Sequence, residues 1–353
     1  MSNHKTFLFF LALGVFFLGE CTAQQRTLLA LSKSDHTLAI VNPLTLKVIA
    51  RIPVGVDPHE VISSSDGKTA YVSIYGGGSY HEINVIDLVE RKPLYNIDTK
   101  PLMGPHGLAF VDGKVWFTAE GSKSVGRYDP STRKEDWCMG TGQDRTHMIY
   151  VTPQGKKVYT TNVNAGTVSI LETDTLLRQG MPLGSTPATR QSKMHPPPPP
   201  GFRQEWMETV IPVSEGCEGF DVSPDGRQLW TASAKDGRIF IVDLLSKKVS
   251  ATLDAKVWGA NRLQFTVDGK MVLVSSLRSG NLYVFDEASQ KEIKQIHIGH
   301  GGAGILMDPD GTRAFVGCTP DNYVAVIDLK TMEVVKHINV GGGPDGLAWA
   351  VRK

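Results

Sequence analysis

Three histidines stand at matching positions in successive repeats of this 353-residue chain. His59, His106 and His147 each come just before an apolar, strand-like run, and the next repeat carries Glu218 at the matching position. Imidazole is a ligand for Zn, Cu, Ni and Fe, and a metal site that does chemistry needs three or four converging groups with one open position. The pattern predicts a transition-metal site, holding Cu, Zn or Fe, that is made by these four side chains.

Polar residues also occupy this position, or the one beside it, in other repeats. Glu218 could complete the metal sphere or act as a general base, and Cys217 beside it could contribute a thiolate. Asn261, Arg262 and Asp345 would line the opposite wall, where they could orient a polar or anionic substrate or bind a cofactor. The alternative is structural, because a histidine at a repeated position can simply hydrogen-bond the neighbouring repeat and tie the fold together.

The elements that must position these residues recur roughly every 43 residues. Each unit has an apolar strand, an Asp-Gly turn and a second apolar strand, as at 61–72 and 108–117. The alternation is that of half-buried strands, and Asp-Gly supplies the positive backbone angle of a tight hairpin. A third strand that ends in an acidic residue, such as 83–87, and a more polar fourth strand follow. Four antiparallel strands per unit are typical of a propeller blade.

The two ends of the chain together supply one further blade. Six units are complete, the chain begins with three strands at 27–31, 37–42 and 48–53, and it ends with a single first strand at 343–349. Closing the ring with these strands removes the open sheet edges. We therefore predict an all-β fold, a seven-bladed β-propeller of four-stranded antiparallel blades whose ring is closed by N-terminal strands pairing with the C-terminal strand.

Blade geometry predicts where the histidines meet. The first strand of each blade lines the central channel, and the residue just before it lies at the channel mouth, on the face opposite the Asp-Gly turns. Aligning the repeats gives seven mouth residues: His59, His106, His147, Glu218, Asn261, Ala303 and Asp345. Because the mouth residues of adjacent blades converge, the predicted metal site lies at the channel mouth, with Trp206 and Trp258 as further candidates for its wall.

The repeated unit resembles a known family. Gly-Pro-His/Asp-Gly-Leu-Ala, then Asp-Gly-Lys, Tyr-Val and Val-Ile-Asp are similar to the YVTN-repeat, or YncE-like, β-propellers over nearly all of the mature chain. The resemblance implies an envelope or surface propeller, distantly similar to the haem-binding propeller of cytochrome nitrite reductases. It implies no single activity, because propellers host binding modules, lyases, lactonases and metal enzymes. The chain has no Cys-x-x-Cys-His, so we expect no covalent haem.

The first residues are typical of an export signal. A short polar start, an apolar run at 7–18 and the small residues before Gln24 predict a signal peptide at 1–23. Lipidation at Cys21 is the alternative, although Glu20 departs from the lipobox pattern. Either way we expect a periplasmic or secreted protein, and a lipoprotein if Cys21 is lipidated.

The rest of the chain, 24–353, forms the predicted propeller, with a proline-rich insertion at 181–209 where the spacing of the repeats lengthens. The 37 basic and 36 acidic residues do not favour a nucleic-acid partner. No stretch of the mature chain is apolar enough to span a bilayer. The expected partners are a small-molecule ligand or an envelope protein at the channel face.

Three functions fit this sequence. The first is a metal enzyme or metal-binding protein, with a histidine-rich metal or cofactor site at the channel mouth. The second is a non-catalytic scaffold that binds a ligand or a protein of the cell envelope on the same face. The third is a metal-free lactonase- or lyase-like enzyme that uses histidine and Glu218 as acid and base. Bound metal separates the first function from the others, and turnover without metal separates the third from the second.

Overall fold

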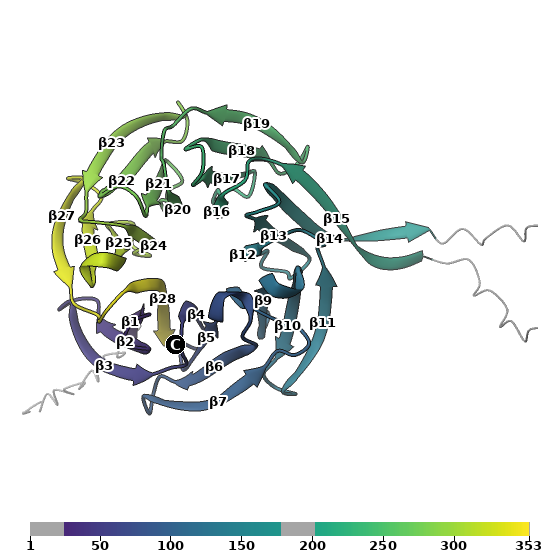
Figure 1. The fold of residues 1–353 in the computed structure, drawn as a ribbon, viewed down its shortest axis with the longest axis horizontal. Helices are drawn as coiled ribbons and strands as arrows, with labels where there is room; N and C mark the ends of the chain where they lie inside the picture. The colour runs from purple at the N-terminus through teal and green to yellow at the C-terminus, as the bar shows by residue number, and fades with distance from the viewer. Residues whose placement is uncertain (1–24, 178–201, 353) are drawn as a thin grey trace, which may run out of the picture.

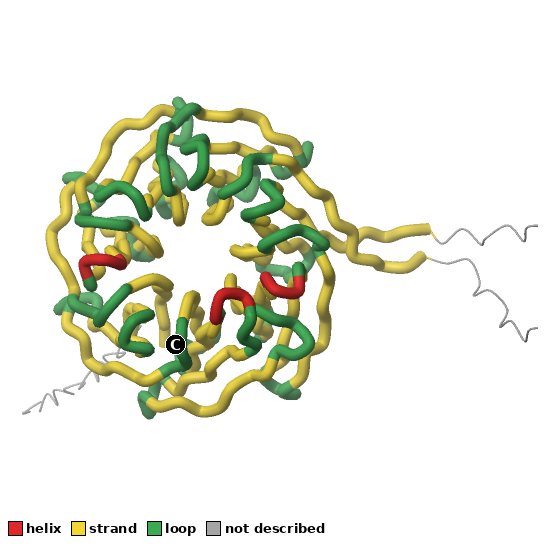
Figure 2. The backbone as a smooth tube through the Cα atoms, in the orientation of Figure 1, coloured by secondary structure: helices red, strands yellow, loops and turns green. Residues whose placement is uncertain are grey.

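A computed structural model describes residues 25–177 and 202–352, and in it the strands form seven four-stranded antiparallel sheets arranged in a ring (Figure 1). We number the blades 1 to 7 from the one that contains β1, so blade 1 is β28-β1-β2-β3 and blade 7 is β24 to β27. The predicted fold class is confirmed. Figure 2 shows the same path as a tube, with three short 3-10 turns in red: η1 (Gly76–Gly78), η2 (Glu120–Ser122) and η3 (Thr319–Asp321).

Each blade begins with the strand nearest the channel. These innermost strands are β4 (Pro58–Ser63), β8 (Pro105–Val111), β12 (Thr146–Val151), β16 (Cys217–Val222), β20 (Ala260–Phe265), β24 (Gly302–Met307) and β28 (Pro344–Arg352). The second strands are β1 (Gln25–Ser32), β5 (Thr69–Ile74), β9 (Lys114–Ala119), β13 (Lys157–Asn162), β17 (Gln228–Ser233), β21 (Met271–Ser276) and β25 (Arg313–Cys318).

The two outer positions of each blade follow in chain order. The third strands are β2 (Thr37–Asn42), β6 (Glu82–Asp87), β10 (Ser124–Asp129), β14 (Thr167–Leu177), β18 (Ile239–Asp243), β22 (Asn281–Asp286) and β26 (Tyr323–Asp328). The outermost strands are β3 (Lys47–Pro53), β7 (Lys92–Asp98), β11 (Lys134–Gly140), β15 (Phe202–Pro212), β19 (Lys248–Leu253), β23 (Lys291–His297) and β27 (Glu333–Ile338).

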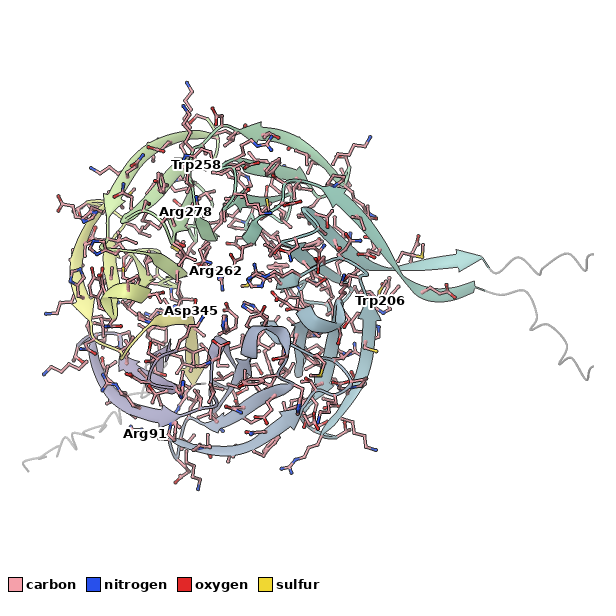
Figure 3. All side chains as sticks on the ribbon, in the orientation of Figure 1. Arg91, Trp206, Trp258, Arg262, Arg278 and Asp345 are labelled. Atoms are coloured by element: carbon pink, nitrogen blue, oxygen red, sulfur yellow. The ribbon has the colours of Figure 1, made fainter. Side chains whose placement is uncertain are left out.

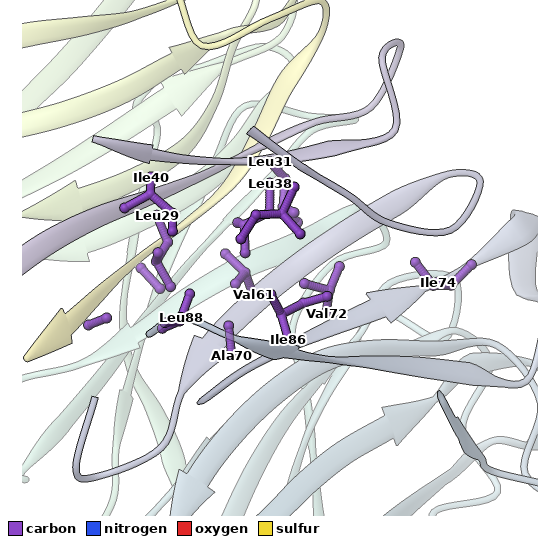
Figure 4. Packing of buried hydrophobic residues seen from close by; sticks show 13 residues of the cluster. Leu29, Leu31, Leu38, Ile40, Val61, Ala70, Val72, Ile74, Ile86 and Leu88 are labelled. Carbon is purple, nitrogen blue, oxygen red and sulfur yellow. The ribbon is translucent and has the colours of Figure 1, made fainter. Parts of the chain in front are cut away.

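The hydrophobic core lies between neighbouring blades. Second and third strands such as β5 and β6 are buried on both faces, whereas outermost strands such as β3 alternate between exposed and half-buried residues. Figure 4 shows one interface, where Leu31 and Leu38 of blade 1 belong to the same apolar cluster as Val61 and Val72 of blade 2. This burial of apolar surface holds consecutive blades face to face.

The ring closes as the sequence predicts. β28 pairs antiparallel with β1, and the register matches Gln25 with Arg352 and Leu28 with Trp349. Blade 1 is therefore built from both ends of the chain, which leaves no open edge between the first and the last blade.

The third and fourth strands of blade 4 are longer than those of the other blades. β14 and β15 pair over eleven residues each and project beyond the ring (Figure 1). The end of the predicted insertion, 202–209, therefore belongs to β15, and the rest of it falls largely outside the described residues. The predicted signal peptide, 1–23, also lies outside them. Within the described ranges, no helix has the length and apolar character needed to cross a membrane.

Candidate functional site

The seven mouth residues occupy the same place in every blade, because each is the second residue of an innermost strand. The strands thus begin slightly earlier than the sequence predicts. In blades 2 to 7 the strand register shifts just after its first pair; in blade 2 Pro58 pairs with Ile74, and the next pair is Val61 with Val72. Such a bulge disrupts the ladder locally and re-aims side chains, and bulges are common beside functional sites.

Main-chain carbonyls of mouth residues tie neighbouring blades together. The hydroxyl of Thr118 accepts a hydrogen bond from Gly107 N at 2.8 Å and donates to the carbonyl of His147, in the next blade, at 2.5 Å. Thr161 donates in the same way to the carbonyl of Glu218 at 2.5 Å. The structural alternative therefore holds for the backbone of His147. Two imidazoles also make contacts between blades, from His106 to His59 and from His147 to Glu120.

The three histidines of the predicted site lie together, and we call them the histidine cluster. His106 Nε2 lies 3.0 Å from His59 Nδ1. The rings of His106 and His147 are 3.7 Å apart between centroids and tilted by 33°. His106 and His147 are both only 1% exposed, so two imidazoles form a buried floor and His59 lies beside them.

Carboxylates flank the His147 ring on both sides. Its Nδ1 is hydrogen-bonded to Glu120, and its Nε2 lies 2.8 Å from Glu218 Oε1 without the alignment of a hydrogen bond. Tyr75 donates its hydroxyl hydrogen to Glu120. Arg145 bridges the two acids, with Nε 3.4 Å from Glu120 and Nη2 3.7 Å from Glu218. His147 is therefore the centre of a charged network.

The charges of this network set the protonation of its members. Burial lowers the pKa of His147, but Glu218 and Glu120 outweigh burial and raise that pKa above its ordinary value. Burial raises the pKa of Glu218, but His147, Arg262 and Arg145 outweigh it and hold that pKa at about 2. A carboxylate with so low a pKa is a weak base at neutral pH. The network thus favours Glu218 as the charge partner of His147 over the predicted general base.

One ring nitrogen of the floor, His106 Nδ1, has no partner. His59 Nε2 lies 3.0 Å from the Asp57 carboxylate, which assigns its proton to that nitrogen and makes His59 Nδ1 the acceptor for His106 Nε2–H. Burial and the neighbouring His147 and His59 lower the pKa of His106 well below its ordinary value, so this ring is neutral. Its Nδ1 is then a buried lone pair without a donor, whereas His147 Nε2 faces the Glu218 carboxylate at 2.8 Å.

The donor atoms do not form a complete metal centre. Among the residues that the structure describes, no group of three or more His, Cys, Asp or Glu side chains is placed to hold a metal ion. His106 pairs with His59, and His147 pairs with its two carboxylates. Cys217 is buried in blade 5, and burial raises the pKa of its thiol to about 12, which disfavours the predicted thiolate. The metal centre therefore stays a prediction.

The far wall is made by the three residues predicted for it. Arg262 reaches across the channel to bond Glu60 of blade 2, and its Nη1 donates to the Asn261 carbonyl at 3.3 Å. Asp345 accepts from Lys33 Nζ at 3.2 Å. Figure 3 shows Arg262 and Asp345 beside the central channel. Because Glu60 already neutralises Arg262, a ligand anion would have to compete with that carboxylate.

A cavity of about 390 Å³ lies deeper in the channel. Its wall includes Glu60, Arg262 and apolar residues such as Phe110 and Phe220. None of the seven mouth residues is part of that wall. The ion pair across the channel therefore separates the mouth from this cavity. Trp206 is not at the mouth: it packs 4.7 Å from Trp137 at the outer side of the ring (Figure 3).

Five residues of the site escaped the sequence analysis: Asp57, Glu60, Tyr75, Glu120 and Arg145. Tyr75 and Glu120 directly follow the second strands of blades 2 and 3. Aligning the residue after each second strand, and not only the residue near each first strand, could have found them. Asp57 and Arg145 stand two residues before a mouth histidine, where most blades have glycine. This departure from the repeat could have identified both residues.

Comparison with known proteins supports the fold and identifies no family. No family model matches the sequence, and no curated protein sequence matches it. Many solved structures match by shape. One is the Kuenenia stuttgartiensis hydrazine synthase, at 17% identity over 82% of this chain and 89% of that chain, with a TM-score of 0.64.

Two further neighbours have different descriptions. A proposed 6-phosphogluconolactonase of Bacteroides fragilis has 12% identity and a TM-score of 0.69 over 93% of this chain and 98% of its own. The dihydro-heme d1 dehydrogenase NirN, solved in complex with DHE, has 16% identity and a TM-score of 0.60 over 89% of this chain and 63% of its own. At these identities the likeness establishes a seven-bladed propeller with haem-related and lactonase-like neighbours, and it leaves the activity open.

Proposed function

We propose that this protein is an exported propeller of the YVTN-repeat type and that its channel mouth is a histidine-rich site for a transition-metal ion or a metal-bearing cofactor. The observation that carries the proposal is the unpartnered nitrogen His106 Nδ1, on a ring that stacks on His147, with both rings almost fully buried. Buried polar atoms are nearly always satisfied, and an orphan often marks an ion or a water that belongs there.

The chemistry of the donors supports this occupant. A neutral imidazole offers a lone pair, which is what a metal ion takes, and binding at His147 would release the proton that its carboxylates now stabilise. Glu218, ionised and next to His147 Nε2, is the third donor. Glu120 would then fix the orientation of the His147 ring, as carboxylates behind metal-bound histidines do. A bound Cu, Zn or Fe would supply a Lewis acid, and Cu or Fe would add redox chemistry.

Export is the second element of the proposal. The layout of residues 1–23 and the YVTN-like repeats support a periplasmic or secreted protein, with a lipid anchor if Cys21 is modified. Elution of the mature chain from the envelope or secreted fraction, with an N-terminus at Gln24, tests this element; retention in the cytoplasm with residues 1–23 still attached would contradict it.

Element analysis of the untagged protein, exported to its own compartment, tests the metal. We expect a near-stoichiometric transition metal that disappears in the double variant His106→Ala, His147→Ala. The matched control is Asn261→Ala, at the same position of blade 6, which should keep the metal. Absence of metal from the wild type, with no uptake when Zn²⁺, Cu²⁺ or Fe²⁺ is added, would contradict the proposal.

A metal-free role is the second candidate, and a specific observation favours it. His147 is held by Glu120 on one side and faces Glu218 on the other, which is the arrangement of an acid–base imidazole oriented by a carboxylate. Such a site could open a lactone-like ring, or simply bind a polar ligand or an envelope protein without turnover. Ligand binding or turnover that survives a strong chelator would favour this candidate over the metal site.

A further inference from the structure

The channel mouth has an outer layer above the histidine cluster. Two residues before each mouth residue, every blade turns through a left-handed backbone conformation, with φ between 56° and 84°. The residues at this position are Asp57, Gly104, Arg145, Gly216, Gly259, Gly301 and Gly343. Glycine adopts such angles without penalty, whereas a side chain at this position costs conformational free energy.

The two exceptions are the two that contact the site. Asp57, at φ 61°, places its carboxylate 3.0 Å from His59 Nε2. Arg145, at φ 60°, bridges the carboxylates that flank His147. Residues other than glycine are uncommon in this conformation. The side chains are thus retained against the local backbone preference at the two places where they reach the histidine cluster, which points to a role beyond folding.

Their exposure differs from that of the floor beneath them. About a third of each side chain is exposed, 33% for Asp57 and 34% for Arg145. The side chains of His59 and Glu218 are only 14% and 16% exposed. Asp57 covers the outer nitrogen of His59, and Arg145 lies across both carboxylates that flank His147. A molecule that enters from solvent therefore meets these two opposite charges first.

We propose that Asp57 and Arg145 are the entrance residues of the channel-mouth site: they cover the histidine cluster and position the ligand that reaches it. Neither residue is a catalytic group; both are positioning residues. This inference deepens the proposed function and rests on it for the nature of the ligand. The covering role itself concerns only the residues of the protein, so it can be tested whether or not a metal binds.

The variants Asp57→Gly and Arg145→Gly test the inference, because they install the residue that five blades already use. Arg91→Gly is the matched control. Arg91 is exposed, has φ 56° in an outer hairpin, and lies far from the channel (Figure 3). Thermal unfolding would establish that each variant folds. Should a glycine variant fail to fold, Asp57→Asn and Arg145→Gln remove the charge but keep most of the side chain.

The first measurement is acylation of the histidines of the metal-free mature protein by diethyl pyrocarbonate, at a pH high enough for His147 to be neutral and resolved by mass spectrometry. We expect Arg145→Gly to speed modification of His147 several-fold and Asp57→Gly to speed modification of His59, with intermediate rates for Arg145→Gln and Asp57→Asn. Arg91→Gly should leave both rates unchanged. Rates at wild-type values in both site variants would overturn the inference.

The second measurement is titration of the same proteins with Zn²⁺ alone. Affinity should fall about tenfold or more in Asp57→Gly, which loses a carboxylate beside the site, the size of one lost charged contact. It should not fall in Arg145→Gly, which loses a cation that neutralises Glu120 and Glu218, and it should be unchanged in Arg91→Gly. A wild type that binds no Zn²⁺, with accelerated acylation in the variants, would count against Zn²⁺ as the ligand and uphold the entrance role. Unchanged acylation with intact Zn²⁺ binding in the variants would overturn the entrance role and uphold the metal site.

Discussion

The two halves of the channel mouth share a backbone and differ in chemistry. Both have the bulged innermost strand with a mouth residue in second place, and both have blades tied by a hydroxyl to the next carbonyl. Blades 2 to 5 present the ionisable set of His59, His106, His147 and Glu218, whereas blades 6, 7 and 1 present Asn261, Ala303 and Asp345.

This difference distinguishes the residues that build the propeller from the residues that form the candidate site. Features common to all blades serve the ring, because a closed repeat must present the same contacts at each interface. Features confined to blades 2 to 5 are not needed for the ring, since blade 7 takes its place in it with Ala303 at the same position. The unpartnered nitrogen of His106, the carboxylates that flank His147 and the two non-glycine turn residues all fall in this half.

The largest expected loss of stability follows substitution of His147. His147→Ala should lower the free energy of unfolding by about 3–5 kcal/mol, because Glu120 and Glu218 would then face each other across a buried space without their cation. Asn261→Ala in blade 6, which loses one weak contact to Arg262, should cost about 1 kcal/mol or less. Urea unfolding at neutral pH measures both. Equal losses would mean that the two halves do not differ as described.

Acid should lower the free energy of unfolding by protonating Glu218 in the histidine half. Its pKa is about 2 in the folded protein against an ordinary 4.5, so the stability it provides is present above about pH 4.5 and is lost as the pH falls toward 2. Glu218→Gln should lower the free energy of unfolding at pH 5 by about 3 kcal/mol, and the gap to the wild type should close near pH 2.

His147 has the opposite dependence on pH. Its pKa is raised, so its contribution is present below about pH 6.5 and is lost as the pH rises through its folded-state pKa. The stability difference between the wild type and Glu218→Gln should therefore shrink at alkaline pH as well. A difference that stays constant from acid to alkaline pH would contradict the charged network.

The hydroxyl ties should matter equally in both halves. Thr118→Val breaks the contacts to Gly107 and His147, and Ser275→Ala breaks the matching contacts to Arg262 and Ala303. Each leaves a buried donor and a buried acceptor unsatisfied, so each should cost about 2 kcal/mol. Thermal or urea unfolding of the two variants checks this. A much larger loss for Thr118→Val would mean that the mouth histidines also carry the fold.

The smallest expected effect is on the far wall. Lys33→Met removes the 3.2 Å contact to Asp345, a partly exposed ion pair, and should change stability by about 1 kcal/mol or less. It should leave Zn²⁺ uptake intact, because Lys33 is not among the contacts of His106 or His147. Loss of Zn²⁺ uptake in this variant would contradict the division into two halves, because the metal site would then depend on blade 1 as well.

The fold was readable from the sequence because it repeats. Strand alternation, Asp-Gly turns and the complementary chain ends all recur, so each unit supports the next. The same alignment found His59, His106 and His147, because one structural position carried them. It missed Glu120 and Tyr75, which follow a different strand and reach His147 and each other only after the blades pack.

The pairing of the side chains was not readable. Whether His106 faces a metal ion, His59 or a carboxylate depends on rotamers that no spacing fixes. The placement of Trp206 failed for a related reason: the long strands β14 and β15 carry it outward along the hairpin, to pack against Trp137. Regular backbone follows from pattern, whereas side-chain partners follow from tertiary packing.

A crystal structure of the untagged protein, recovered from its exported fraction and supplied with the metal that element analysis identifies or with Zn²⁺ if none is found, tests the central claim most directly. The claim is that the half-ring of blades 2 to 5 is the ligand site. We predict non-protein density that contacts His106 Nδ1 and His147 Nε2, with Asp57 and Arg145 at its outer side. A mouth that holds only water, with both nitrogens unligated, would contradict the claim.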